Sequence, residues 1–238
     1  MSVTTSLRSR FGAAAAIAAA AVAMLAAPAA HASTADLQVV PPGVPAYGQT
    51  PSQFGASWWK FVVTKPAPVN PLTDTTGANC AVGQSGLVWY LTGSFPDAGP
   101  ITRSCTIPFG KAIVIPVSNG AYFAFPDDPA AQRTEAYIRS QVTPVQKTAT
   151  NLKASIDGSA VTNPARFFEQ STVFSATLPA NNIYGADAGQ VLSPAVDAGY
   201  YLIINPLLPG KHQIKVSSTI PGAGSVDVTY NITTSLFG

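Results

Sequence analysis

The sequence predicts a mainly β protein: a β-sandwich of jelly-roll or immunoglobulin-like type with two added helices. Short runs of β-branched and aromatic residues, separated by Gly, Pro and Asn turn signals, fill most of the chain. The two helical patterns do not alternate regularly with these runs, which argues against a parallel α/β fold. Charged residues make up only 10% of the chain, against about 25% in an average soluble protein. This low charge argues against a helical bundle held by ion pairs.

Residues 1–32 carry the three parts of a secretory signal peptide. Arg8 and Arg10 form the basic part, an apolar run covers residues 11–27, and Ala30-His31-Ala32 gives the small residues that signal peptidase reads. We expect cleavage after Ala32, because a spanning helix needs about 20 strongly apolar residues and alanine inserts weakly. An uncleaved anchor is the alternative. No later stretch is long and apolar enough to span a membrane, so the sequence predicts a secreted or extracytoplasmic protein.

The composition after cleavage narrows the partners and the chemistry. Residues 33–238 contain eleven basic and eleven acidic residues, and no cluster of Lys or Arg that would attract nucleic acid or anionic lipid. Cys80 and Cys105 are the only cysteines, and in an oxidising compartment they predict one disulfide. His212 is the one histidine left after cleavage. The sequence therefore predicts no metal and no cofactor.

The first elements are an arm and a helix. Residues 33–48 contain Pro41, Pro42 and Pro45 and predict an extended N-terminal arm. A helix is predicted to follow: Thr50 and Gln53 fit a capping box, and Pro51 suits the first helical position. Its apolar residues share one face: Phe54, Trp58, Phe61 and Val62.

The remaining elements predict two β lobes. Residues 49–148 combine the first helix with strands at 87–91, 104–108 and 112–117 and with a second helix from Asp128 to about Thr148. Residues 149–238 predict an immunoglobulin-like lobe with strands near 152–156, 172–176, 200–204, 212–216 and 226–233. The pattern leaves open whether the two lobes share one core.

Several short motifs stand out along the chain. They include Trp58-Trp59, Asp74-x-Thr76-Gly77, Cys80, Gly83-Gln84-x-Gly86, Val88-Trp89-Tyr90-Leu91, Arg103-x-Cys105 and Ile107-Pro108-x-Gly110-Lys111. These motifs resemble those of a group of uncharacterised secreted bacterial β-rich proteins. The resemblance implies a secreted bacterial protein and brings no activity with it. The Pro-Gly-x-His-x-Ile stretch at residues 209–214 also resembles the penultimate strand of many immunoglobulin-like modules.

Aromatic residues supply the first candidates for a binding surface. Adjacent helical residues lie about 100° apart, so Trp58 is expected in the core, whereas Trp59, next to Lys60, is expected beside it or exposed. An exposed indole would offer a stacking surface for a sugar ring or an apolar partner. The alternative is that Trp59 packs under the C-terminal lobe. Trp89 and Tyr90 point to opposite faces of one strand, so one of them can face solvent.

Polar residues near the predicted disulfide supply the other candidates. Gln84 and Arg103 lie inside or beside the Cys80–Cys105 loop, and Asp74 precedes it. They are candidate ligand contacts, and a buried Arg103–Asp74 ion pair that holds the loop is the structural alternative. Asp74 also fits a turn residue, whereas Asp187 and Asp197 fit neither a cap nor a turn.

The catalytic patterns are weak. Gly83-Gln84-Ser85-Gly86 is not a nucleophile elbow, because position 87 is Leu where that motif needs its second glycine. Glycosidases need a pair of carboxyl groups, and Glu135 and Glu169 are the only glutamates. We therefore assign no catalytic residue and favour a non-catalytic protein that binds a glycan or another cell-envelope component. The alternatives are an extracellular hydrolase or lyase acting on a polymer, with Asp74, Gln84 and Arg103 as its polar centre, and a purely structural envelope protein. The candidate ligand-binding residues are Trp59, Lys60, Asp74, Gln84, Trp89 and Arg103.

Overall fold

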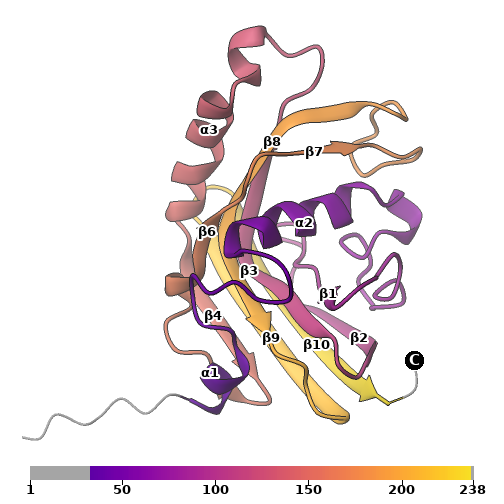
Figure 1. Cartoon of the computed structure of the whole chain (residues 1–238), viewed down its shortest axis with the longest axis vertical. Coiled ribbons are helices and arrows are strands. Elements are labelled where there is room, and N and C mark those ends of the chain that lie inside the picture. Colours follow the sequence, from indigo (N-terminus) through magenta and orange to yellow (C-terminus); the bar gives the residue numbers. More distant parts are fainter. Residues whose placement is uncertain (1–32, 237–238) are drawn as a thin grey trace, which may run out of the picture. The chain divides into compact units, whose positions relative to one another are not determined.

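The structure is a computed structural model that describes residues 33–236, and these belong to one compact unit. The predicted signal peptide and its cleavage site lie outside the described residues. The unit is mainly β, with two mixed sheets and accompanying helices (Figure 1). Within residues 33–236, no helix is long and apolar enough to cross a membrane.

The two sheets have five strands each, and one parallel pair makes each of them mixed. In the first sheet the order is β1–β3–β8–β6, with β7 also paired to β8, and β1 runs parallel to β3. In the second sheet the order is β2–β10–β9–β4–β5, and β2 runs parallel to β10. The first sheet comprises β1 (Val88–Tyr90), β3 (Ala112–Phe123), β6 (Phe168–Gln170), β7 (Phe174–Thr177) and β8 (Val191–Ile204). The second comprises β2 (Ile101–Pro108), β4 (Thr150–Ile156), β5 (Ser159–Ala160), β9 (Gly210–Ile220) and β10 (Gly224–Ser235).

One apolar core joins the two sheets. It contains Ile115 and Leu202 from the first sheet and Val216 and Tyr230 from the second, all buried. Strands from residues 49–148 pair with strands from residues 149–238 in both sheets, as β3 does with β8 and β2 with β10. The two parts of the chain that the sequence separated therefore share one core.

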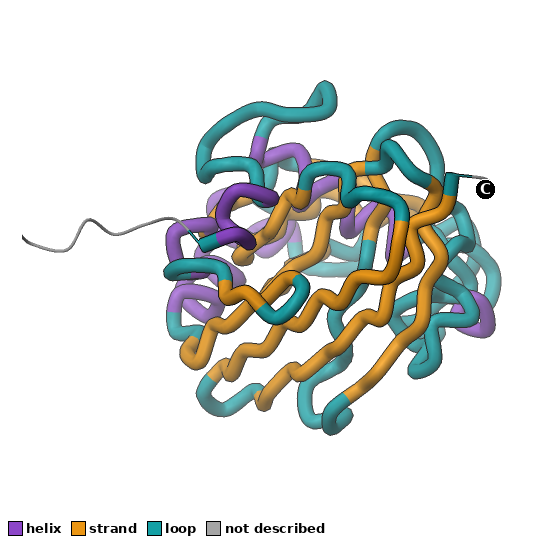
Figure 2. The backbone as a smooth tube through the Cα atoms, turned by 90° about the horizontal axis from the view of Figure 1, so that it is seen from below, coloured by secondary structure: helices purple, strands orange, loops and turns teal. Residues whose placement is uncertain are grey.

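Helices lie on both faces of the first sheet. Helix α2 (Pro51–Val63) begins as predicted, with the capping box between Thr50 and Gln53, and buries Trp58 on the face turned away from the second sheet. Helix α3 (Glu135–Lys147) packs its Ile138 against Val196 and Ala198, on the face of β8 that farther along the strand packs against the second sheet. Because α2 and α3 both contact the first sheet, neither lies across the outer face of the second sheet (Figure 2).

Three element predictions need correction. The arm begins with a helix, α1 (Thr34–Gln38), because Ser33 and Asp36 form a capping box. Asp128 does not start α3: its carboxylate accepts the Phe125 backbone N–H in a turn, and Thr134 caps the helix instead. Strand β8 begins nine residues before the predicted residue 200. The described residues also contain short 3₁₀ helices: η1 (Ala67–Val69), η2 (Ala130–Arg133) and η3 (Pro164–Phe167).

Candidate functional site

Trp59 is not the exposed stacking surface that the sequence suggested. Its ring is partly buried and packs edge-on against Trp58 and Phe123, with ring centroids 5.0 and 5.5 Å away. Its indole N–H donates to Asp197 Oδ1 at 2.8 Å. Trp58 is fully buried, as expected, and its indole N–H donates to the carbonyl of Leu91. The structural alternative for Trp59, packing beneath a C-terminal segment, is the arrangement observed.

Trp89 is also removed from solvent. It lies in the core between the two sheets and is only 7% exposed. Tyr90, on the opposite face of β1, is partly buried against Phe61, with ring centroids 5.3 Å apart. Neither face of β1 therefore presents a free aromatic ring, and Trp89 offers no exposed ring on which a ligand could stack.

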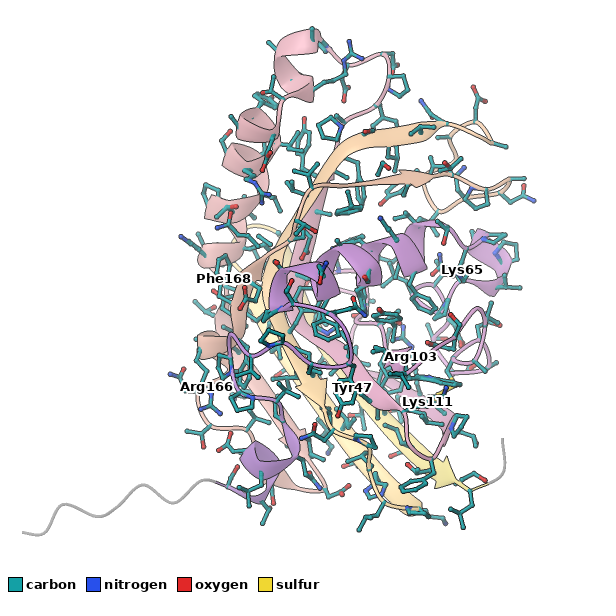
Figure 3. All side chains as sticks on the ribbon, viewed as in Figure 1. Tyr47, Lys65, Arg103, Lys111, Arg166 and Phe168 are labelled. Atoms are coloured by element: carbon teal, nitrogen blue, oxygen red, sulfur yellow. A yellow bond between two sulfur atoms is a disulfide. The ribbon has the colours of Figure 1, made fainter. Side chains whose placement is uncertain are left out.

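The Arg103 side chain is buried and binds other segments of the same chain (Figure 3). Its guanidinium donates to the backbone carbonyls of Leu72, Asp74, Thr92 and Gly93 and to the hydroxyl of Tyr230. The contact with Asp74 is 2.7 Å to the backbone oxygen, so the predicted Arg103–Asp74 ion pair is wrong. Arg103 fastens the irregular segment after α2 to β10, and it is 1% exposed, which leaves no path to a ligand.

The side chains of Asp74 and Gln84 are used locally. The Asp74 carboxylate accepts the backbone N–H groups of Thr76 and Asn79, both at 2.8 Å. Partial burial raises the pKa of Asp74, but these hydrogen bonds outweigh it and hold the pKa below its ordinary value. The Gln84 amide donates to the carbonyl of Tyr90 and accepts the Tyr90 backbone N–H, so it continues the hydrogen bonding of β1 at that edge.

The predicted residues therefore do not converge on one open cleft. Asp74, Gln84 and Arg103 surround the Cys80–Cys105 disulfide, which is present as predicted, and they hold this part of the chain together. Of the predicted ligand-binding residues, Lys60 lines a polar hollow of about 260 Å³ beside α2. The arrangement around the disulfide is that of a scaffold.

The polar group that the sequence did not assign to a site is Asp197. It lies on β8 beneath α2 and is 1% exposed. Its Oδ1 accepts the hydroxyl of Tyr201 at 2.9 Å as well as the Trp59 indole N–H, and Asn119 donates to the Tyr201 oxygen at 2.8 Å. The other carboxyl oxygen, Oδ2, is buried without a hydrogen-bond partner. Burial raises the pKa of Asp197 to about 8, although the bonds from Trp59 and Tyr201 lower it.

The glycine at position 55 fits this carboxyl group. A Cβ at Gly55 would lie 2.2 Å from Asp197 Oδ2, so only glycine lets the middle of α2 approach β8 so closely. A glycine inside a helix lowers the stability of the helix by about 1 kcal/mol relative to alanine. The close packing of α2 over Asp197 explains why a glycine is nevertheless present at position 55. A signal was available in the sequence, because Asp197 interrupts the apolar residues of 195–204. Its partners on α2 could not be identified from that signal.

The open surface of the unit is the outer face of the second sheet. In β2 and β10 solvent-facing polar residues alternate with buried residues that are mostly apolar, and the parallel register sets Thr102 beside Thr229 and Ser104 beside Asn231. Gln213 of β9 lies opposite Asn231 and donates to its side-chain oxygen at 2.9 Å. Ser, Thr, Asn, Gln and Lys make up most of this face: Thr102, Ser104, Thr106, Lys153, Ser155, Lys211, Gln213, Lys215, Ser217, Asp227, Thr229, Asn231 and Thr233.

Two depressions lie on this outer face. One, of about 620 Å³, is lined by residues that include Ser104, Gln213 and Asn231. The other, of about 420 Å³, is lined by residues that include Lys153 and Lys215. Both volumes fall in the range of about 300–1,000 Å³ that small-molecule sites occupy.

His212 stands at the rim of the first depression. Its Nδ1 lies 2.7 Å from an Asp157 carboxylate oxygen, and its Nε2 lies 2.8 Å from the Leu208 carbonyl. Partial burial lowers the pKa of His212, but its hydrogen bonds with Asp157 and Leu208 outweigh this and raise it above the ordinary value. Because Nε2 faces a carbonyl oxygen, it must donate there and cannot take a proton from a serine hydroxyl. The imidazole is held as a fixed polar group.

Comparison with known proteins adds little to this geometry. No protein-family model matches the chain, and no curated protein matches it. One solved structure is similar to it: the crystal structure of a cysteine protease inhibitor from Entamoeba histolytica. The similarity covers 62% of this chain and 96% of the inhibitor, with 15% sequence identity and a TM-score of 0.24. A TM-score this low supports no conclusion about function.

Proposed function

We propose that this chain is an extracytoplasmic, non-catalytic β-sandwich protein that binds a glycan on the outer face of its second sheet. The observation that carries the proposal is the regular array of hydrogen-bonding side chains on that face, with two depressions in it. A disulfide and the lack of a membrane-spanning helix in residues 33–236 are compatible with a place outside the cytoplasm.

The chemistry of the face suits sugar hydroxyl groups. A hydroxyl both donates and accepts hydrogen bonds, and the side chains of Ser, Thr, Asn and Gln do the same. The hydrogen bond from Gln213 to Asn231 leaves the Gln213 side-chain oxygen and the Asn231 amide nitrogen for a ligand. Lys211, at the same depression, adds a positive charge that suits an acidic sugar.

The proposal places the ligand away from the residues that the sequence favoured. Trp59 and Trp89 pack inside the protein, so binding on the second sheet would depend on hydrogen bonds instead of stacking. The alternative of a hydrolase or lyase centred on Asp74, Gln84 and Arg103 loses its polar centre, because all three are engaged by the chain's own backbone.

Changing Gln213 and Asn231 together to alanine is expected to weaken glycan binding about tenfold. Each side chain would lose a ligand hydrogen bond worth about 0.5–1.5 kcal/mol, and both lie on the surface, so the fold should be kept. A printed glycan array probed with residues 33–238 would identify the best-bound oligosaccharide. Isothermal titration calorimetry with that oligosaccharide would then give the dissociation constants of wild type and variant.

The matched control is Lys60→Ala, which removes an exposed side chain from the hollow beside α2. It should leave the dissociation constant unchanged. The proposal is contradicted if the array shows no bound glycan, or if Lys60→Ala weakens binding while the double variant does not. The second result would move the site to α2.

A further inference from the structure

The most exposed large apolar side chains of the described residues are four leucines. Leu37, Leu208, Leu236 and Leu87 are 74%, 72%, 65% and 63% exposed. Within residues 33–236 every other large apolar side chain is at most 50% exposed. Isolated apolar residues on a surface need no explanation, but a group of them at one place does.

These four leucines come from separate segments that meet at one end of the two sheets. The backbone N–H of Asn205 donates to the carbonyl of Gln38, which joins α1 to the loop between β8 and β9 that carries Leu208. Phe109, 45% exposed, donates its N–H to the carbonyl of Ser235, next to Leu236. The carbonyl of Leu87 accepts the N–H of Ala112 at the start of β3. Figure 1 shows α1 and the end of β10 at this lower end.

The charges at this end favour an anionic partner. Lys111, in the turn between β2 and β3, donates to the carbonyl of Gly86, so it stands beside Leu87 and Phe109 (Figure 3). The acidic groups here are engaged within the protein: Asp36 by Arg166 and Asp157 by His212. A cation therefore remains among the exposed leucines, and the carboxylates nearby are already paired.

We propose that this end docks on the surface of an anionic lipid bilayer, with Leu37, Leu87, Leu208 and Leu236 among the lipid headgroups. Each leucine projects from its own segment, so together they offer several separate points of insertion. A fluid apolar phase can receive separate points, whereas a protein partner needs one contiguous complementary patch. Apolar insertion combined with electrostatic attraction is the usual basis of reversible binding at a membrane surface.

The first depression on the outer face of the second sheet borders this end, because His212 at its rim bonds to the Leu208 carbonyl. The second depression has its own lining, which includes Lys153 and Lys215.

The test is co-sedimentation of residues 33–238 with unilamellar vesicles. The protein is expected to bind vesicles that mix phosphatidylglycerol with phosphatidylcholine, and to bind pure phosphatidylcholine vesicles more weakly. Changing Leu208 and Leu236 together to serine should weaken binding about tenfold or more, since each leucine loses the transfer of its side chain out of water. Lys111→Glu should reduce the preference for phosphatidylglycerol, and Lys111→Glu together with Lys211→Glu should abolish it.

The matched control changes two exposed valines elsewhere, Val145 and Val191, to serine; they are 45% and 46% exposed. This variant should bind vesicles as wild type does. Absence of vesicle binding by the wild type overturns the proposal, and so does equal binding by the leucine variant. Sedimentation velocity without lipid gives a further check, because a dimer that the leucine variant loses would assign this end to a second copy of the chain.

Discussion

Replacing Arg103 with methionine is expected to destabilise the protein by about 3–5 kcal/mol, which is enough to unfold many small domains. Methionine fills most of the space of the arginine stem but offers no donor. Four backbone carbonyls and the Tyr230 hydroxyl would lose their hydrogen bonds from the guanidinium in a buried space. Urea unfolding, followed by the fluorescence of the three tryptophans, would measure the loss.

Arg133→Met is the matched control. Arg133 is exposed on η2, and this change should alter the free energy of unfolding by no more than about 0.5 kcal/mol. If the Arg103 variant is never recovered as folded protein while the Arg133 variant is, the conclusion is the same. Equal urea midpoints for the two variants would show that the Arg103 contacts contribute nothing to stability.

Changing Asp197 to asparagine is expected to stabilise the protein at alkaline pH and to flatten its pH dependence. The pKa of Asp197 rises from an ordinary 3.8 to about 8 in the folded protein, chiefly because the group is buried. Between these values the unfolded chain has released the proton that the folded protein keeps. Wild-type stability should therefore fall as the pH rises through this window, by up to about 1.4 kcal/mol per pH unit. Urea unfolding at about pH 5 and about pH 8 measures the slope.

The asparagine variant imitates the neutral acid, because its oxygen still accepts from Trp59 and Tyr201. Its advantage over wild type should be small near pH 5 and reach a few kcal/mol near pH 8. Asp197→Ala is the comparison: it also removes the slope, but it leaves the Trp59 N–H and the Tyr201 hydroxyl without this acceptor, so it should be less stable than Asp197→Asn at every pH. A wild type whose stability is flat over the window would contradict the burial of an ionisable group here.

Local chemistry made part of the fold predictable. The start of α2 follows from Thr50, Pro51 and Gln53, because a capping box and an N-terminal proline act within one turn. The disulfide is predictable from the two cysteines, because the predicted secretory signal implies an oxidising compartment. The sequence does not predict the first half of β8, because Pro194 weakens the strand pattern there, and it predicts an extended arm where Ser33 caps α1.

The sites were less predictable, because they depend on contacts between distant segments. Helical geometry placed Trp59 beside the apolar face of α2, but it could not show that β8 brings Asp197 against it, 138 residues later. Arg103 was expected to pair with a carboxylate, whereas backbone carbonyls from several loops surround it. Strand alternation could not decide which side of β1 faces the second sheet, and that choice buries Trp89.

The parallel pairing of β2 with β10 has a consequence for how the protein folds. Arg103 and Tyr230, which bond across this pair, are 127 residues apart in the chain, and β10 stands between β2 and β9. Contacts of such high sequence separation slow folding, because a long loop must close before they form. The second sheet cannot be completed until its last strand is present. A chain exported from its N-terminus would thus stay unfolded until nearly all of it had crossed, in the state that translocation requires.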